Sequence, residues 1–131
     1  MAKRITAIKA YAPRLKLNRT LQTATLSELI QRRTAFNRGE ILGLLSELNE
    51  LIIDHLLRGT PVKIDGLGTF SPAMHLDGSL HVNVRIDRSL IRALNAPDAL
   101  KGKVINRRNI GLSSGDLIAL WNRRRPEDPV A

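Results

Sequence analysis

The stretch that decides the fold is Leu56-Leu57-Arg58-Gly59-Thr60-Pro61-Val62-Lys63-Ile64-Asp65-Gly66-Leu67-Gly68-Thr69-Phe70. It joins the end of a long amphipathic segment to a segment punctuated by glycines. Gly59 is expected to end a helix in the left-handed conformation, and Pro61 prevents the helix from restarting. From Val62 to Phe70 the alternation of apolar and polar residues predicts one β-strand, in which Gly66 and Gly68 permit a twist or a close backbone approach.

Upstream of this stretch, the sequence predicts one long helix that begins at Asn37. Asn37 and Glu40 form an Asn-x-x-Glu capping box, in which each side chain can accept a hydrogen bond from a free backbone N–H. One short strand cannot cover all the apolar side chains of this helix, so a second copy of the same helix is the simplest partner. The apolar residues recur at helical spacing, at Ile41, Leu44, Leu45, Leu48, Leu51, Ile52 and Leu56.

The helix, the glycine turn and the Gly-x-Gly-x-Phe motif together resemble the HU and integration host factor family of bacterial DNA-bending proteins. The resemblance covers about residues 22–94, judged by the order of elements and the motif. In that family a Leu-x-x-Gly-x-x-Val-x-Leu-x-Gly-Phe-Gly-Thr-Phe run joins the dimerisation helix to the DNA-facing sheet. Leu67 stands here where the family usually has its first Phe.

The resemblance implies an α+β fold, in which a helical hairpin packs under a short antiparallel sheet and two chains form an intertwined homodimer. This chain adds a basic N-terminal extension at residues 1–20 and a basic loop with an extra C-terminal helix at residues 97–131, around an HU-like domain at residues 21–96. The residues expected at the dimer interface are Leu44, Leu48, Leu51, Ile52, Leu67 and Phe70.

A tight hairpin is predicted downstream, where Asp77-Gly78 joins the strands Ser71–Leu76 and Ser79–Ile86. The second strand alternates apolar and polar residues, so one of its faces is apolar and the other is polar and basic. HU-type proteins carry long basic arms at this point, each tipped by a proline that wedges between base pairs. Because only a tight turn stands here, we expect contacts with the DNA backbone that tolerate any base sequence, without intercalation.

The N-terminal segment, residues 5–17, alternates loosely and is interpreted as an extended arm that is partly strand. Such an arm has three possible courses: along its own domain, across to a second subunit, or along DNA. A short helix should follow at residues 25–33, capped by a Thr25/Glu28 box. At its end, Arg32 and Arg33 suit the negative end of the helix dipole as well as they suit a phosphate.

Two further helices are predicted towards the C-terminus. Asp87 is expected to cap a helix over Arg88–Asn95, and Ser113 or Ser114 a last helix that contains Trp121. The Arg123-Arg124-Arg125 run after it can bind phosphate or cap the end of the helix.

The charge of the chain favours a polyanionic partner. The 131 residues hold 21 Lys and Arg against 12 Asp and Glu, a net charge of +9 with a pI near 11.1. Residues 21–60 are near neutral, with four basic against five acidic residues, and the excess lies in the flanking segments. A solvated basic surface would give the same distribution, so the charge by itself does not identify DNA.

Other classes of function find little support in the sequence. There is no cysteine, which excludes a thiolate zinc site and a cysteine nucleophile. His75 and His81 flank the predicted turn without further ligands at suitable spacing, so they are interpreted as exposed strand residues and no metal or other cofactor is expected. The start of the chain lacks the apolar run of a signal peptide, and a cytoplasmic protein without enzymatic activity is expected.

The sequence thus predicts a nucleoid-type dimer that binds duplex DNA without sequence specificity through its basic sheet face and flanks. The alternative is an HU-like dimerisation scaffold that binds a protein or RNA partner without bending DNA. The expected DNA-binding residues are Lys63, His81, Asn83, Arg85, Arg88, Lys101, Lys103, Arg107, Arg108, Arg123, Arg124 and Arg125.

Overall fold

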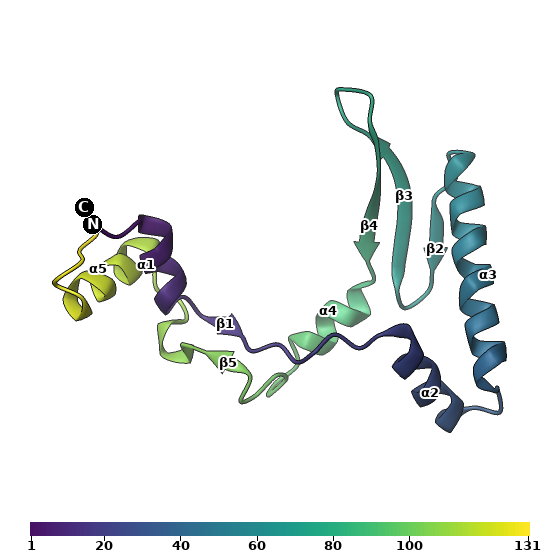
Figure 1. Ribbon diagram of the computed structural model, residues 1–131, viewed down its shortest axis with the longest axis horizontal. Helices are drawn as coiled ribbons and strands as arrows, with labels where there is room; N and C mark the ends of the chain where they lie inside the picture. The colour runs from purple at the N-terminus through teal and green to yellow at the C-terminus, as the bar shows by residue number, and fades with distance from the viewer. The chain divides into compact units, whose positions relative to one another are not determined.

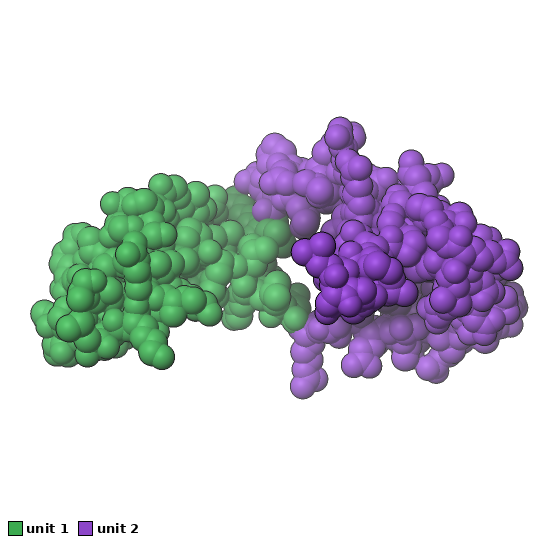
Figure 2. Space-filling model, turned by 90° about the horizontal axis from the view of Figure 1, so that it is seen from above, with its two compact units in different colours: residues 1–18, 100–131 green, residues 19–99 purple.

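The computed structural model describes every residue from Met1 to Ala131, and the chain is α+β. The chain forms two compact units, which Figure 2 shows in two colours. Unit 1 combines residues 1–18 with residues 100–131, and unit 2 comprises residues 19–99. The division into an extension, an HU-like domain and an appended segment stays a prediction. No helix of the chain has the combination of length and apolar character needed to cross a membrane.

Unit 2 contains three helices and a three-stranded antiparallel sheet with the strand order β2-β3-β4 (Figure 1). Helices α2 and α3 pack against each other, and α3 also contacts β2 and β3. This helical pair beside a small sheet is compatible with the expected HU-like fold. The elements are α2 (Thr23–Arg33), α3 (Arg38–Leu57), β2 (Val62–Ile64), β3 (Gly68–Met74), β4 (Leu80–Ile86) and α4 (Arg88–Leu94).

The boundaries of α3 confirm the Asn37 cap and the Gly59 end, but the Glu40 half of the predicted capping box is wrong, because the Glu40 carboxylate does not bond the Asn37 backbone N–H. The side-chain oxygen of Asn37 accepts a hydrogen bond from the Glu40 N–H at 2.9 Å, while the Glu40 carboxylate accepts from the Asn37 side-chain amide. Gly59 follows the helix with a φ of 78°, in the left-handed region that glycine adopts most easily. The predicted Thr25 cap is wrong, because α2 already begins at Thr23 and Thr25 lies inside its first turn.

The segment from Val62 to Phe70 is a hairpin, so the prediction of a single strand is wrong. Gly66 has a φ of 81° and reverses the chain, and the Leu67 N–H donates to the Ile64 carbonyl at 3.0 Å. As a result Ile64 pairs with Gly68 across the turn. The reversal makes β3 the central strand, with β2 on one side and β4 on the other.

The second hairpin of unit 2 forms at the predicted Asp77-Gly78 turn and pairs Met74 with Leu80. Gly78 has a φ of 90°, and the Asp77 carboxylate accepts hydrogen bonds from the Ser79 hydroxyl at 2.6 Å and the Ser79 N–H at 2.9 Å. These hydrogen bonds, from the Ser79 side chain first and its backbone second, lower the pKa of Asp77 from its usual value. The predicted hairpin is therefore confirmed.

In unit 1 a helix replaces most of the expected extended arm. Ala7 of this helix is fully buried against α5, and the Tyr11 ring meets the Trp121 ring edge-on at 6.3 Å between centroids. Only Arg14 and Leu15 form a strand, which pairs antiparallel with a segment near the C-terminus. The elements of unit 1 are α1 (Arg4–Tyr11), β1 (Arg14–Leu15), β5 (Val104–Ile105), the 3-10 helix η1 (Arg107–Asn109) and α5 (Ser114–Arg124).

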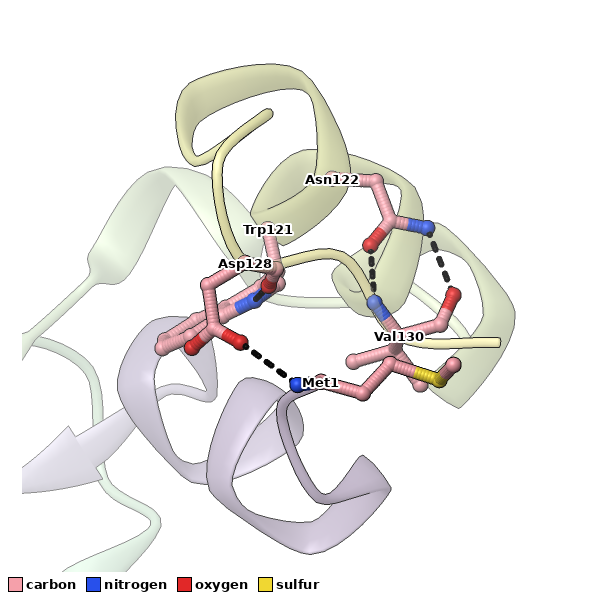
Figure 3. A network of polar contacts seen from close by, with 5 residues as sticks. All are labelled: Met1, Trp121, Asn122, Asp128 and Val130. Atoms are coloured by element: carbon pink, nitrogen blue, oxygen red, sulfur yellow. Dashed lines mark hydrogen bonds and ion pairs between the residues drawn. The ribbon is translucent and has the colours of Figure 1, made fainter.

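The two ends of the chain meet within unit 1, as Figure 3 shows. The Met1 amino group lies 3.4 Å from an Asp128 carboxylate oxygen, and the Trp121 indole N–H donates to the Asp128 carbonyl at 2.7 Å. The Asn122 side chain exchanges hydrogen bonds with the backbone of Val130. Of the two predicted caps of α5, Ser113 is confirmed, and it forms a reciprocal capping box with Asp116 that was not predicted.

The two units differ in how much apolar surface they bury. Of the five buried hydrophobic residues in the chain, only Ile41 belongs to unit 2. In that unit the outward side chains include Leu44, Val82 and Ile86, each more than half exposed. Unit 2 therefore has two apolar faces, on α3 and on the sheet, that its own side chains do not fill.

Candidate nucleic-acid interface

A basic hollow lies where the sheet of unit 2 meets α4. Lys63 of β2, Thr69 of β3 and Arg85 of β4 are paired across the sheet, so the three side chains stand in one row on one face. Arg88 and Arg92 are four residues apart on α4, which places them on one side of that helix. The hollow has a volume of about 400 Å³ and is lined by Lys63, Gly68, Thr69, Arg85, Ile86, Asp87, Arg88 and Arg92.

Two local features hold the hollow in shape. Gly68 lies so close to β4 that a Cβ atom there would stand 2.6 Å from the Arg85 carbonyl oxygen. Asp87 caps α4, because its carboxylate accepts a hydrogen bond from the Ser89 N–H at 2.9 Å, and its own N–H donates to the Leu67 carbonyl. The hydrogen bonds from Ser89 lower the pKa of Asp87, with a smaller contribution from the Lys63 charge.

The hollow is electropositive. Four cationic side chains line it, and Asp87 is its only acid. None of these cations has a carboxylate within 4.0 Å, since the one ion pair of that length in the chain joins Met1 and Asp128. Cationic side chains without a local partner on an open surface are suited to the phosphates of a nucleic acid.

The structure does not bring two of the predicted sheet residues into this hollow. His81 stacks on His75, with the ring centroids 4.0 Å apart, and its Nδ1 atom is buried without a hydrogen-bond partner. His81 also borders an apolar pocket beside Leu57. Asn83 is exposed and pairs across the sheet with Ser71.

Three more of the predicted residues, Arg107, Arg108 and Arg124, line a second hollow, which lies entirely in unit 1. Its volume is about 380 Å³, and its other lining residues are Tyr11, Asn106, Asn109 and Leu120.

The remaining predicted residues of unit 1 lie outside both hollows. The Lys103 ammonium group donates to the Asn18 side chain at 3.0 Å, and the Arg125 guanidinium lies over the Trp121 ring, 4.7 Å from its centroid. Arg125 therefore packs on an aromatic ring at the end of α5. Lys101 and Arg123 are exposed and line neither hollow.

Five of the six residues predicted for the dimer interface lie on α3 or on the sheet, and the sixth, Leu67, lies in a turn. Leu48, Ile52 and Phe70 line one apolar groove of about 470 Å³ between α3 and the sheet. Leu44 and Leu51 are more than half exposed on α3, and Leu67 is 55% exposed in the turn before β3. The other residues of the groove are Leu45, Asn49, Ile53, Leu56, Val82 and Val84.

The expected site residues leave out several members of the two hollows. Arg92 follows Arg88 by one helical turn, so the four-residue spacing in the sequence could have added it. Tyr11, Asn106 and Asn109 depend on the association of the two chain ends, for which a single sequence carries no signal.

Comparison with known proteins identifies the family of this chain. A search of curated proteins finds no match to this chain. A family model described as an HU domain fused to a wHTH, Ig, or Glycine-rich motif matches residues 3–95. The match extends from α1 through all three strands of unit 2 to the end of α4. Since it covers well over half of the chain, this protein belongs to the HU-HIG family.

Proposed function

We propose that this protein is a nucleoid-associated dimer of the bacterial cytoplasm that binds duplex DNA through phosphate contacts, without sequence specificity and without enzymatic activity. Membership of an HU-domain family supports DNA binding at the level of the family. The observation that carries the proposal for this chain is the basic hollow of unit 2, where Lys63, Arg85, Arg88 and Arg92 converge without a carboxylate partner.

The uncovered apolar faces of unit 2 support the dimer. Contiguous exposed apolar patches mark protein interaction sites, and most soluble oligomers are symmetric assemblies of identical chains. The groove between α3 and the sheet is bordered by the apolar side chains of both elements, so the same faces of a second copy would match it in chemistry. A second copy is therefore the simplest occupant of the groove.

The short β3–β4 turn supports binding without intercalation. Five residues, His75 to Ser79, separate the strands, and they hold no proline. Proteins that kink DNA strongly insert an apolar wedge between base pairs, at a cost of a few kcal/mol for each unstacked step. Without such a wedge, Arg and Lys contacts to the backbone carry the affinity, and these contacts do not read the base sequence.

One observation favours a second candidate function, an HU-like dimerisation scaffold for a protein or RNA partner that does not bend DNA. Unit 2 by itself carries nine basic and nine acidic residues, so the unit with the HU-like fold has no net attraction for a polyanion. Under this alternative, the dimer should form without measurable affinity for duplex DNA at physiological salt.

The test is the binding of a fluorescently labelled duplex by the full chain, measured over a series of salt concentrations. The R85A/R88A/R92A variant removes three cations from the hollow, and R19A/R38A/R58A removes the same charge from exposed positions elsewhere in unit 2. If each hollow arginine neutralises a phosphate, the variant dimer loses six phosphate contacts, so its log–log salt slope should fall by about 5, while the slope of the control should fall by less than about 1. Equal slopes for the two variants would refute the hollow as the contact surface.

Dimer formation is tested separately by sedimentation. Leu48→Glu places a charge in the apolar groove, and Glu47→Gln changes the neighbouring exposed residue of α3 without touching the groove. We expect the wild type and E47Q to sediment as dimers and L48E as a monomer or an unfolded chain. A monomeric wild type at micromolar concentration would refute the dimer.

A further inference from the structure

The net charge of the chain resides in unit 1. That unit carries twelve basic and three acidic residues, which gives +9, while unit 2 carries nine of each. The excess positive charge is therefore confined to the unit formed by the two chain ends, and the HU-like unit is neutral. Because long-range attraction to a polyanion increases with net positive charge, unit 1 should supply most of the electrostatic attraction to DNA.

Some of the basic residues of unit 1 line a defined hollow, and the others are spread over its surface. Arg107 and Arg108 approach from η1 and Arg124 from α5, around the Tyr11 ring. The Arg124 guanidinium lies 5.7 Å from the centroid of that ring, close enough for a cation–π interaction that orders the side chain. None of the three arginines has a carboxylate within 4.0 Å. Each of the three guanidinium groups can donate two hydrogen bonds to a phosphate.

Two asparagines fix the arginine-bearing segment to the end of α1. The Asn106 amide donates to the Ala10 carbonyl at 3.0 Å and to the Ala12 carbonyl at 3.1 Å, and the Asn109 amide donates to the Tyr11 carbonyl at 2.7 Å. Asn106 adopts a φ of 59°, in the left-handed region that asparagine enters more easily than most residues. Segments almost a hundred residues apart in the chain are thus held together at the rim of the hollow, so its shape is set before a ligand arrives.

We infer that the hollow of Arg107, Arg108 and Arg124 is a second DNA-backbone site, independent of the hollow in unit 2, and that it provides the larger share of the affinity. The ligand is a phosphodiester group of duplex DNA. This inference rests on the proposed function for the identity of the ligand, duplex DNA. It goes further because it assigns the main electrostatic contact to unit 1, which is built from the two chain ends.

The experiment compares three variants of the full chain with the same loss of charge. R107A/R108A/R124A empties the hollow of unit 1, K3A/R4A/K9A removes exposed cations of unit 1 outside the hollow, and R85A/R88A/R92A empties the hollow of unit 2. At about 150 mM salt, we expect the first variant to lose at least tenfold in affinity for a labelled duplex, the second less than threefold, and the third an intermediate amount. Equal losses in the first and second variants would overturn the site, because diffuse charge would then explain the binding.

A second measurement does not depend on total affinity or on the stability of the triple variant. Arg124 also contacts Tyr11, so R107A/R108A keeps that packing and serves as the milder variant. On addition of a 12-base-pair duplex, the backbone amide NMR signals of residues 106–109 should shift in the wild type and stay in place in R107A/R108A.

Shifts confined to unit 2 would overturn the inference while leaving DNA binding intact. If the wild type binds no duplex at all, the proposed function itself fails. Preferential binding of duplex RNA that R107A/R108A abolishes would assign the hollow to RNA and overturn the DNA assignment.

Discussion

Replacing Gly68 with alanine tests how the two strands of the basic hollow are held together. The added Cβ atom would stand 2.6 Å from the Arg85 carbonyl oxygen and 3.3 Å from the Ile86 Cα atom. The first contact is 0.8 Å shorter than the 3.4 Å at which ordinary contacts begin, and the obstructing atoms belong to the backbone. Because β3 is the central strand, it cannot move away from β4 without disturbing its pairing with β2. Overpacking of this kind costs about 1–3 kcal/mol.

The assay is thermal and urea unfolding, followed by circular dichroism at fixed protein concentration. For a unit of this size, about 1–3 kcal/mol corresponds to a fall in Tm of roughly 5–20 °C. Gly43→Ala is the matched control, because Gly43 lies within α3 and an added Cβ there would meet no atom within 4 Å. That control should gain up to about 1 kcal/mol, since alanine is favoured over glycine in helices. A Gly68→Ala variant as stable as the wild type would refute the close approach of β3 and β4.

Three further variants test other parts of the structure. Asn37→Ala removes the cap that receives the Glu40 N–H, and it should lower the free energy of unfolding by about 1 kcal/mol in urea titrations; an unchanged midpoint would contradict the cap. The lowered pKa values of Asp77 and Asp87 stabilise the fold above the usual pKa of a carboxyl group, and this stabilisation is lost as pH falls through the lower folded-state values. The D77N/D87N variant should therefore lose less Tm than the wild type between about pH 5 and pH 2, and parallel curves would contradict the assignment. Asn106→Ala removes two hydrogen bonds and places alanine at a φ of 59°, so it should destabilise unit 1 by about 2 kcal/mol. The fluorescence of Trp121, the single tryptophan, reports that loss, and unfolding identical to the wild type would rule it out.

Four features of the fold that depend on local chemistry could be predicted from the sequence, although the equally local Thr25 cap was predicted wrongly. The caps at Asn37 and Ser113, the end of α3 at Gly59 and the turn at Asp77-Gly78 each rest on residues within a few positions of one another. Such signals are complete in the sequence, and all four features are present in the structure.

The missed features have two different causes. The turn at Asp65-Gly66 carries the same Asp-Gly signal as the second hairpin, but the alternation that precedes it favoured one continuous strand. Helix α1 is stabilised by contacts with α5, more than a hundred residues away in the chain, and its loose alternation suggested an extended arm. Packing between distant segments can override a local pattern, which a single sequence does not reveal.

The candidate site follows the same division. Lys63, Arg85 and Arg88 could be grouped from strand alternation and helix position, because they lie close together in unit 2. The hollow of unit 1 forms only because α1 packs against α5. The sequence therefore identified its arginines as basic residues but did not show that they lie in one site. The apolar groove could be expected from the sequence, because the apolar face of α3 is too wide for one short strand to cover.

The most direct test of the central claim is the binding of the full-length wild type to labelled duplexes of unrelated sequence, measured by fluorescence anisotropy from about 50 to 300 mM salt. We predict that log K falls linearly with log salt concentration, that the slopes agree for all duplexes, and that binding persists at about 100 mM salt, where exposed charges are screened beyond roughly 10 Å. No duplex binding at that salt concentration, or affinities that differ by orders of magnitude between sequences, would contradict a protein that holds DNA by its backbone.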